Sequence, residues 1–302
     1  MNKSGVFVFF LCLISVVGVP LNAGAVSKDG ELSIAVVNYP LKYFAERIAG
    51  DQIKVVFPIP ANVDPSFWSP EPEGVLAFQA ADLILLNGAT YSKWLNRVSL
   101  PRRRLINTSQ SFKEQYIKVE DPTTHSHGPT GAHAHAGFAF TTWIDLKQAI
   151  RQAEAIRDAL VELAPARKQQ FDVNFSALEA DLLALDRRID EIVAKKRTQP
   201  LVASHPVYDY FARRYGLNIR SVLWEPEKSP TSKQWSELET LLKHHPARWM
   251  IWEGQPGSDS VRRLQAMGLS SFVFDPVANV PASGDFIVVM RRNVENLEAV
   301  FR

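Results

Sequence analysis

The feature that most constrains the fold is a repeated alternation of short apolar runs with amphipathic helical stretches from residue 32 onwards. Because polar residues do not interrupt the apolar runs, these are typical of parallel strands that helices cover on both faces. One set of runs lies within residues 33–107, and a second set begins after Pro200. The sequence therefore predicts an α/β fold with two lobes, each a parallel sheet flanked by helices. We expect strands at 33–37, 53–57, 82–86 and 104–107, and again at 201–204, 219–223, 249–252 and 272–274.

A long helical stretch separates the two sets of strands. Within residues 166–198, large apolar side chains recur every three or four positions and form one stripe on a helix. Roughly 30 helical residues extend on the order of 45 Å, which is enough to bridge two lobes. We therefore expect a first lobe at 26–165, a bridging helix at 166–198 and a second lobe at 199–302. The stripe consists of Phe171, Phe175, Leu178, Leu182, Leu185, Ile189 and Ile192.

The first 25 residues predict an export signal outside the fold. Lys3 precedes an apolar run of roughly 14 residues, shorter than the about 20 that cross a bilayer. Small residues end the segment at Ala23-Gly24-Ala25, as at a signal cleavage site. We expect an exported protein, cleaved after about Ala25, whose mature chain begins near Val26. The single cysteine, Cys12, leaves with this segment, so N and O ligands would hold any metal that the mature chain binds.

Charge and motifs exclude several classes of protein. Lys and Arg total 34 against 32 Asp and Glu, a formal net charge of +2, without the basic surplus of a nucleic-acid binder. The sequence also lacks the G-x-S-x-G, P-loop, H-E-x-x-H and G-x-G-x-x-G motifs. We therefore expect a binding protein for a small ligand or metal ion, with no catalytic activity and no nucleic-acid partner.

Candidate binding residues follow the expected strands, at the edge where open α/β sheets bind ligands. His205 and Asp275 each come directly after an apolar run. An imidazole nitrogen and a carboxylate oxygen in one cleft are suitable ligands for a divalent cation. Glu225 and Glu253 occupy equivalent strand ends and are weaker candidates, since acids in loops are commonly solvated.

Four more histidines cluster within residues 113–140, a segment without periodicity that we expect to be a loop. Neutral imidazoles at H-x-H spacing can chelate Zn²⁺, Cu²⁺ or Ni²⁺ reversibly. We interpret the cluster as a metal-binding element, with a neutral hydrophilic linker as the alternative. The four are His125, His127, His133 and His135.

Several segments, in this order and spacing, resemble a known family. They are Pro40–Gly50, Asp64-Pro65 with Trp68, Trp143-Ile144-Asp145, His205–Leu217 and Asp275-Pro276. The pattern resembles the zinc/manganese class of periplasmic solute-binding proteins of ABC transporters over essentially the whole mature chain. This resemblance implies that a divalent metal ion is captured in the interlobe cleft, with zinc as the leading candidate. It also implies delivery of the ion to an ABC permease in the inner membrane.

The resemblance further implies four metal-ligating side chains, two from each lobe, and here the sequence departs from it. His205 and Asp275 match the second lobe's pair, but Ser66 and Thr141 stand where the first lobe's two histidines are expected. Two protein ligands do not make the closed four-coordinate site of tight zinc binding. The sequence therefore predicts a degenerate metal site.

Three interpretations of the cleft follow. In the first, loop histidines replace the missing pair and the cleft still binds a divalent metal. In the second, the cleft is rebuilt for a non-metal or chelated-metal ligand. Four tryptophans at or near the expected cleft favour this interpretation, and core packing is the alternative for each: Trp68, Trp143, Trp224 and Trp252.

In the third, the cleft is inactive. The protein then acts as a periplasmic metallochaperone through the His-rich loop, or the loop contacts a partner.

Overall fold

The computed structural model describes Met1 and residues 32–119, 124–126, 132–134 and 137–302. The rest of the expected signal segment, its cleavage site after Ala25, and both His127 and His135 lie outside the described residues. Residues Glu31–Arg302 form one compact unit. In the described part of the chain, every helix is too short or too polar to cross a membrane.

Two parallel sheets form the two lobes, which confirms the fold predicted from the apolar runs. Among the described residues, the sheets have the orders β2-β1-β3-β4 and β10-β9-β11-β12. In each sheet, therefore, the first strand of the lobe lies between the second and the third. The strands are β1 Ser33–Val36, β2 Lys54–Val56, β3 Leu83–Leu86, β4 Leu105–Asn107, β9 Pro200–Ala203, β10 Asn218–Ser221, β11 Trp249–Trp252 and β12 Ser270–Val273.

Polar side chains fix where several helices begin. At α1, the Asn38 side chain accepts a hydrogen bond from the Leu41 amide at 3.1 Å. At α8, Asp285 accepts one from the Val288 amide at 2.9 Å. The helices besides α4 are α1 Tyr39–Ala49, α2 Pro72–Ala80, α3 Leu146–Leu163, α5 Asp209–Tyr215, α6 Ser232–His244, α7 Ser258–Ala266 and α8 Phe286–Phe301. Short 3₁₀ helices are η1 Gly50–Gln52, η2 Lys93–Arg97, η3 Arg102–Arg104, η4 Gln110–Gln115, η6 Thr142–Ile144 and η7 Pro165–Arg167.

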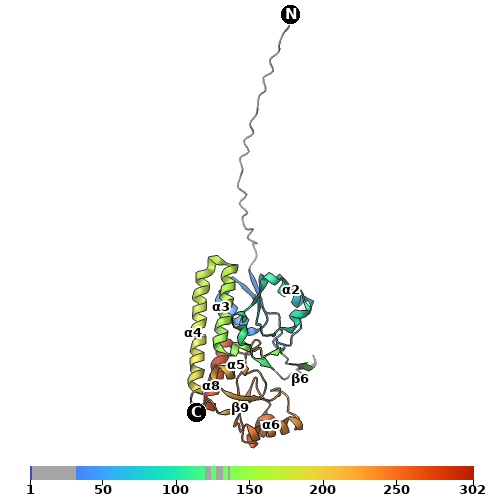
Figure 1. Ribbon diagram of the computed structural model, residues 1–302, viewed down its shortest axis with the longest axis vertical. Helices are drawn as coiled ribbons and strands as arrows, with labels where there is room; N and C mark the ends of the chain where they lie inside the picture. The colour runs from blue at the N-terminus through green and yellow to red at the C-terminus, as the bar shows by residue number, and fades with distance from the viewer. Residues whose placement is uncertain (2–31, 120–123, 127–131, 135–136) are drawn as a thin grey trace. The chain divides into compact units, whose positions relative to one another are not determined.

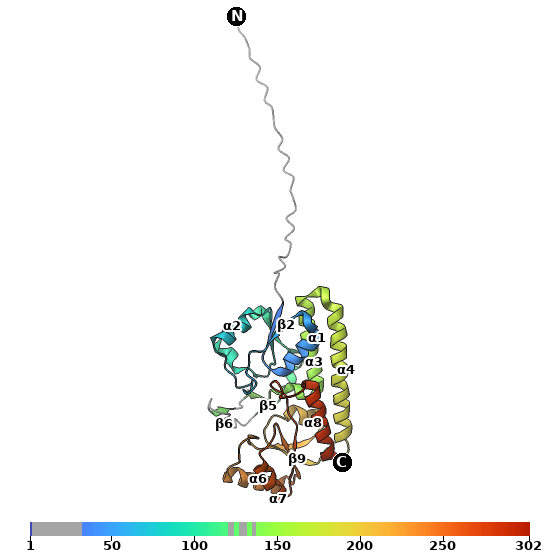
Figure 2. The same cartoon turned by 180° about the vertical axis from the view of Figure 1, so that it is seen from behind.

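The long helix α4, Lys168–Val193, is the expected bridging helix. Its 26 residues span about 39 Å, and the whole predicted apolar stripe is buried. The helix packs against α1 and α3 of the first lobe and against α8 of the second, and Figures 1 and 2 show it running alongside α3 and α8. One continuous helix therefore supports both sheets. The lobe boundaries at 165 and 199 stay a prediction.

The segment 113–140, which we expect to be a loop, contains short strands among its described residues. Strand β5, Lys118–Val119, pairs antiparallel with β8, Gly137–Phe138. Strand β6, Thr124–Ser126, pairs antiparallel with β7, Ala132–Ala134. Strands of two or three residues are too short for an alternating hydrophobic pattern to reveal them.

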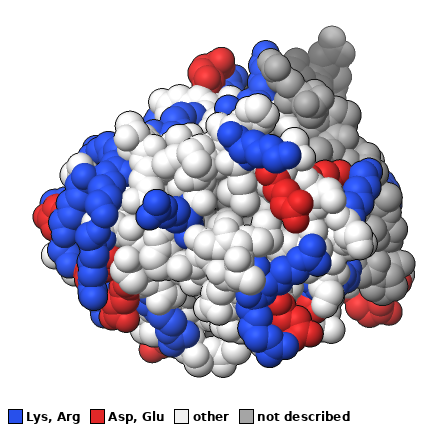
Figure 3. Space-filling model, turned by 90° about the horizontal axis from the view of Figure 1, so that it is seen from below, with Lys and Arg blue, Asp and Glu red and all other residues white. Residues whose placement is uncertain are grey.

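Charges of both signs are interspersed on the face shown in Figure 3. This mixture agrees with the near-equal totals of 34 basic and 32 acidic residues. Interspersed charges do not create the strong single-sign field that steers a nucleic acid to a binding face.

Candidate metal centre

Residues from both lobes line a cavity of about 40 Å³. Most of them come from segments that follow β2, β3, β9, β11 and β12, the carboxyl ends at which the sequence predicts a site, and three come from the segment after β8. Such a volume holds an ion with a water or two, whereas pockets for drug-sized molecules measure roughly 300–1,000 Å³. The polar lining residues are Asp64, Tyr91, Thr141, His205 and Glu253, and the others are Phe67, Phe140, Trp143, Val207, Pro276 and Ala278.

His205 is held in an orientation suited to metal binding. It follows β9 directly and is only 2% exposed. Its Nδ1 lies 3.4 Å from Oε1 of Glu253, which follows the neighbouring strand β11. A carboxylate beside one ring nitrogen favours the proton there and leaves the lone pair of the other nitrogen for a metal. In this tautomer Nε2 of His205 would be the nitrogen available to a metal ion.

Acidic groups interact strongly around the cavity. Burial raises the pKa of Glu253 well above its usual value, and three nearby negative charges raise that pKa further. Those charges belong to Asp64, Glu225 and Asp275. Among the described residues that line the cavity, none is a Lys or Arg. A divalent cation would therefore neutralise a cluster that has no fixed positive charge in its wall.

Asp275 lies beside the cavity, and its neighbour Pro276 is in the wall. Its Oδ1 accepts a hydrogen bond from the Val277 amide at 2.7 Å. Asn293 holds its backbone, accepting from the Asp275 amide at 3.0 Å and donating to the Asp275 carbonyl at 2.7 Å. Burial raises the pKa of this carboxyl as well. The loop after β12 is thus fixed by hydrogen bonds in the second lobe.

The hydroxyls of Ser66 and Thr141 are both engaged in hydrogen bonds. Ser66 donates from its amide and from Oγ to Oδ1 of Asp64, both at 2.8 Å. Thr141 donates from Oγ1 to the Val207 carbonyl. Thr141 lines the cavity, whereas Ser66 supports Asp64, which does line it. Sequence reasoning missed Asp64, although it stands two positions before Ser66 in the same segment.

The tryptophans belong mainly to the core. Trp224 and Trp252 are part of the second lobe's hydrophobic cluster. Trp68 packs edge-on against Trp94, with ring centroids 5.7 Å apart. Trp143 does line the cavity, and its Nε1 donates to the Pro276 carbonyl at 2.6 Å, which links the two lobes. These positions do not favour a site rebuilt around stacked indole rings.

The described residues include no group of three or more His, Cys, Asp or Glu side chains placed to hold one metal ion. Of the loop histidines, His125 and His133 are partner positions in the β6–β7 register. Glu225 does not line the cavity in the described residues, although its charge acts on Glu253. Simultaneous coordination by the cavity side chains therefore requires a local rearrangement.

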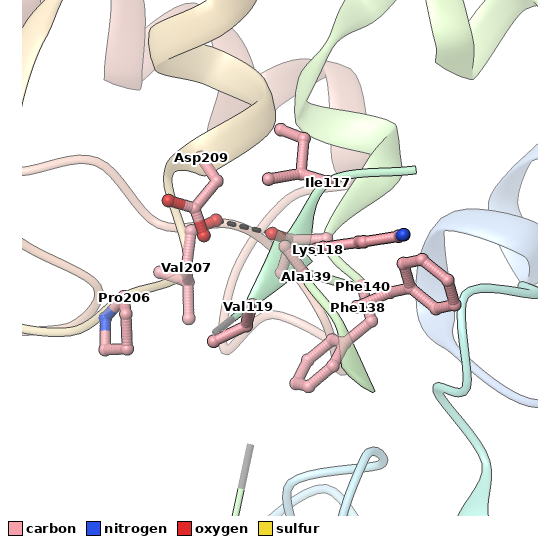
Figure 4. Close-up of a pocket in the computed structure, with 10 residues that line it drawn as sticks. Ile117, Lys118, Val119, Phe138, Ala139, Phe140, Pro206, Val207 and Asp209 are labelled. Carbon is pink, nitrogen blue, oxygen red and sulfur yellow. Dashed lines mark hydrogen bonds between the residues drawn. The ribbon is translucent and has the colours of Figure 1, made fainter. Parts of the chain in front are cut away.

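A second cavity, of about 190 Å³, shares Phe140, Thr141 and Val207 with the first. Figure 4 shows Val207 with the labelled residues of β5 and β8 beside it. Asp209 also lines this cavity, and burial raises its pKa. The Lys118 amine points away from that carboxylate. The pair of short strands thus lies next to the wall of the metal-sized cavity.

Comparison with known proteins gives a family match over nearly the whole described chain. The family model for the zinc-uptake complex component A, periplasmic, matches residues 34–300. The zinc-binding lipoprotein AdcA of Streptococcus pneumoniae serotype 4 is 25% identical over 316 residues, which cover 99% of this chain and 61% of AdcA. The high-affinity zinc uptake system protein ZnuA of Bacillus subtilis is 25% identical over 315 residues, 98% of this chain and 96% of that protein. This chain thus spans only 61% of the length of the first relative.

Solved structures share the fold. Zn(II)-bound AdcA from Streptococcus pneumoniae superposes with a TM-score of 0.75 at 22% identity, over 90% of this chain and 58% of that one. The SBP FpvC from Pseudomonas aeruginosa, in complex with Ni²⁺, gives a TM-score of 0.70 at 21% identity, over 90% and 97% of the two chains. At these identities the likeness shows the two-lobed architecture alone.

Proposed function

Because the chain belongs to the zinc-uptake complex component A family, we propose that it captures a divalent metal ion between its lobes for an ABC importer. Zinc is the leading candidate for this ion. Proteins of this family are solute-binding proteins and not enzymes. The loaded protein would dock on a permease in the inner membrane and release the ion for ATP-driven import. The expected signal cleavage after about Ala25 and a monomeric periplasmic state belong to the same proposal.

One observation carries the proposal. An ion-sized cavity brings His205 together with acidic side chains from both lobes, and its described lining lacks a basic residue. Its volume of about 40 Å³ disfavours an organic ligand in this arrangement. Glu253 stands beside His205 Nδ1, as the outer partner of a metal-ligating histidine usually does. We assign His205 as a ligand and Asp275, beside the cavity, as the second lobe's other candidate.

A periplasmic metallochaperone is the second candidate function. The β6–β7 register, which makes His125 and His133 partner positions, favours it. In this function the His-rich segment collects metal ions by itself, with His127 and His135 as further candidates.

Calorimetry of the mature protein distinguishes these functions. The protein, residues 26–302, is stripped with a chelator and titrated with Zn²⁺, Mn²⁺ and Cu²⁺. Parallel titrations use His205→Ala and a deletion of residues 125–135. We expect wild-type and deleted proteins to bind a cation with similar affinity and His205→Ala to lose at least about 1.4 kcal/mol, a tenfold weakening.

Two outcomes would contradict the importer proposal. If no cation binds the wild type more tightly than about 10 µM, close to −7 kcal/mol, metal import by this chain is excluded. If binding survives His205→Ala but disappears with the deletion, the His-rich segment is the site and the metallochaperone function is favoured. A histidine outside the cavity provides the matched control, because His244→Ala at the end of α6 should leave binding unchanged.

A further inference from the structure

Tyr91 brings a polar group to the cavity that no described residue satisfies. It is 2% exposed and lines the cavity, and its hydroxyl has no hydrogen-bond partner among the described residues. Burial raises the pKa of Tyr91 well above its usual value, and the charge of Asp64 adds to this effect. Tyr91 and Asp64 both line this cavity. A buried hydroxyl without a partner indicates that a ligand or its bound water completes the site.

Contacts with the second lobe bring Asp64 to the same wall. The segment after β2 passes close to Asn279, whose Nδ2 donates to the Pro60 carbonyl at 2.8 Å and to the Val63 carbonyl at 2.7 Å. Ser66 then holds Oδ1 of Asp64 through two hydrogen bonds. These contacts hold the segment before Asp64 against the second lobe and orient the Asp64 carboxylate.

From this geometry we propose that Asp64 is the first lobe's ligand to the captured cation, opposite His205 of the second lobe. The inference deepens the proposed function and depends on it. Glu253 then acts as a positioning residue, because it faces Nδ1 of His205 at 3.4 Å and directs Nε2 towards the ion. Loading requires a small shift of the segment at 60–66, since the described residues include no preformed group of three ligands.

A carboxylate at this position changes which cations the site accepts. Carboxylate oxygens suit Mn²⁺, whereas imidazole nitrogens favour Zn²⁺. With one imidazole and an oxygen-rich remainder, the site should discriminate less between Zn²⁺ and Mn²⁺ than a site with several histidines. Zn²⁺ still binds more tightly than Mn²⁺, as it does at most mixed N and O sites.

Asp64→Asn tests the proposal, because it removes the charge and keeps the size and the acceptor for Ser66. The mature protein and its variants are titrated with Zn²⁺ and with Mn²⁺, each metal alone. We expect Asp64→Asn to weaken Zn²⁺ binding by at least about tenfold and Mn²⁺ binding by a larger factor. The control is Asp209→Asn, an acid in the neighbouring cavity, which should stay within about twofold of the wild type. Circular dichroism and melting of the metal-free variants check that the fold is kept.

X-ray absorption on the zinc-loaded wild type identifies the atoms that coordinate zinc. Because it uses the wild type, the result does not depend on whether any variant folds. We expect one imidazole per zinc, with oxygen atoms as the remaining ligands. Two or more imidazoles per zinc would overturn the assignment of Asp64. The assignment also fails if Asp64→Asn binds both cations like the wild type while His205→Ala does not, although metal capture would then stand. If the wild type binds neither cation, both the proposed function and this inference fall.

Discussion

Glu253 should control how the stability of the metal-free protein depends on pH. Its pKa is raised in the folded state by burial and by neighbouring negative charges. The folded state therefore binds a proton more readily than the unfolded state, and the free energy of unfolding falls as pH rises from about 4.3 towards the raised value. Glu253→Gln removes this contribution to the pH dependence of the free energy of unfolding, because a glutamine side chain does not titrate. We expect it to raise the free energy of unfolding near neutral pH by about 1 kcal/mol.

Urea unfolding of the metal-free protein at about pH 5 and about pH 7.5 measures this pH dependence of the free energy of unfolding, across the range in which a carboxyl with a raised pKa titrates. Glu237→Gln is the control, because Glu237 forms an exposed pair with Lys233 at 3.7 Å. Such a pair should contribute less than about 1 kcal/mol at either pH. An unchanged pH slope in Glu253→Gln would show that this carboxyl is not the group responsible.

At the residue scale, His205 and Asp275 could be proposed from the sequence because each closely follows an expected strand, so the position in the chain indicates the position in the sheet. Asp64 lies in the long connection between β2 and α2, and its place depends on Asn279, far away in the sequence. No periodicity in the sequence reports such a contact.

At the scale of elements, α4 and α5 are joined by one buried ionic cluster. Asp186 of α4 accepts two hydrogen bonds from Arg214 of α5, at 2.9 and 2.6 Å, and one from the Tyr215 hydroxyl at 3.0 Å. Asp186→Ala would leave the Arg214 charge without this partner. We expect a loss of about 3–5 kcal/mol in the free energy of unfolding.

Chemical denaturation of Asp186→Ala checks this value. Arg262→Ala offers a contrast, since its pair with Asp259 is exposed within α7 and should contribute at most about 1 kcal/mol. A loss in Asp186→Ala no larger than that of Arg262→Ala would mean that this cluster does not couple the bridging helix to the second lobe.

Elements with long periodic patterns were predictable, and short ones were not. The α4 stripe repeats over about six turns, so its buried face could be identified before the fold was known. By contrast, the short segment after β3 has no long pattern, and the structure has the 3₁₀ helix Lys93–Arg97 there. Ala89 and Thr90 have positive φ angles of 47° and 59°, which form a tight turn just before it.

For the whole molecule, the lobes are joined both by α4 and by direct contacts across the cavity. The Trp143 indole reaches the Pro276 carbonyl, and Asn279 reaches the Pro60 carbonyl. A continuous helix and these bonds favour a modest tilt of the lobes on loading rather than a wide hinge motion. The cavity geometry should therefore accept ligands at the positions where the family resemblance implies histidines.

The double variant Ser66→His with Thr141→His tests this expectation. Two added imidazoles should raise Zn²⁺ affinity by at least about a hundredfold, or about 2.7 kcal/mol, and Mn²⁺ affinity by much less. Competition titration against a chelator of known affinity measures both changes. Each single variant serves as a control and should give a smaller gain than the pair. Equal Zn²⁺ affinity in wild type and double variant would show that positions 66 and 141 do not converge on the ion.

Anomalous scattering tests the central claim, that the ion sits between the lobes, most directly. Crystals of the mature protein loaded with one equivalent of Zn²⁺ are measured on both sides of the zinc absorption edge. We predict one dominant anomalous peak in the cavity, about 2.0–2.2 Å from Nε2 of His205 and from a carboxylate oxygen of Asp64. A cavity without a peak, with zinc bound only by residues 125–135, would contradict the account.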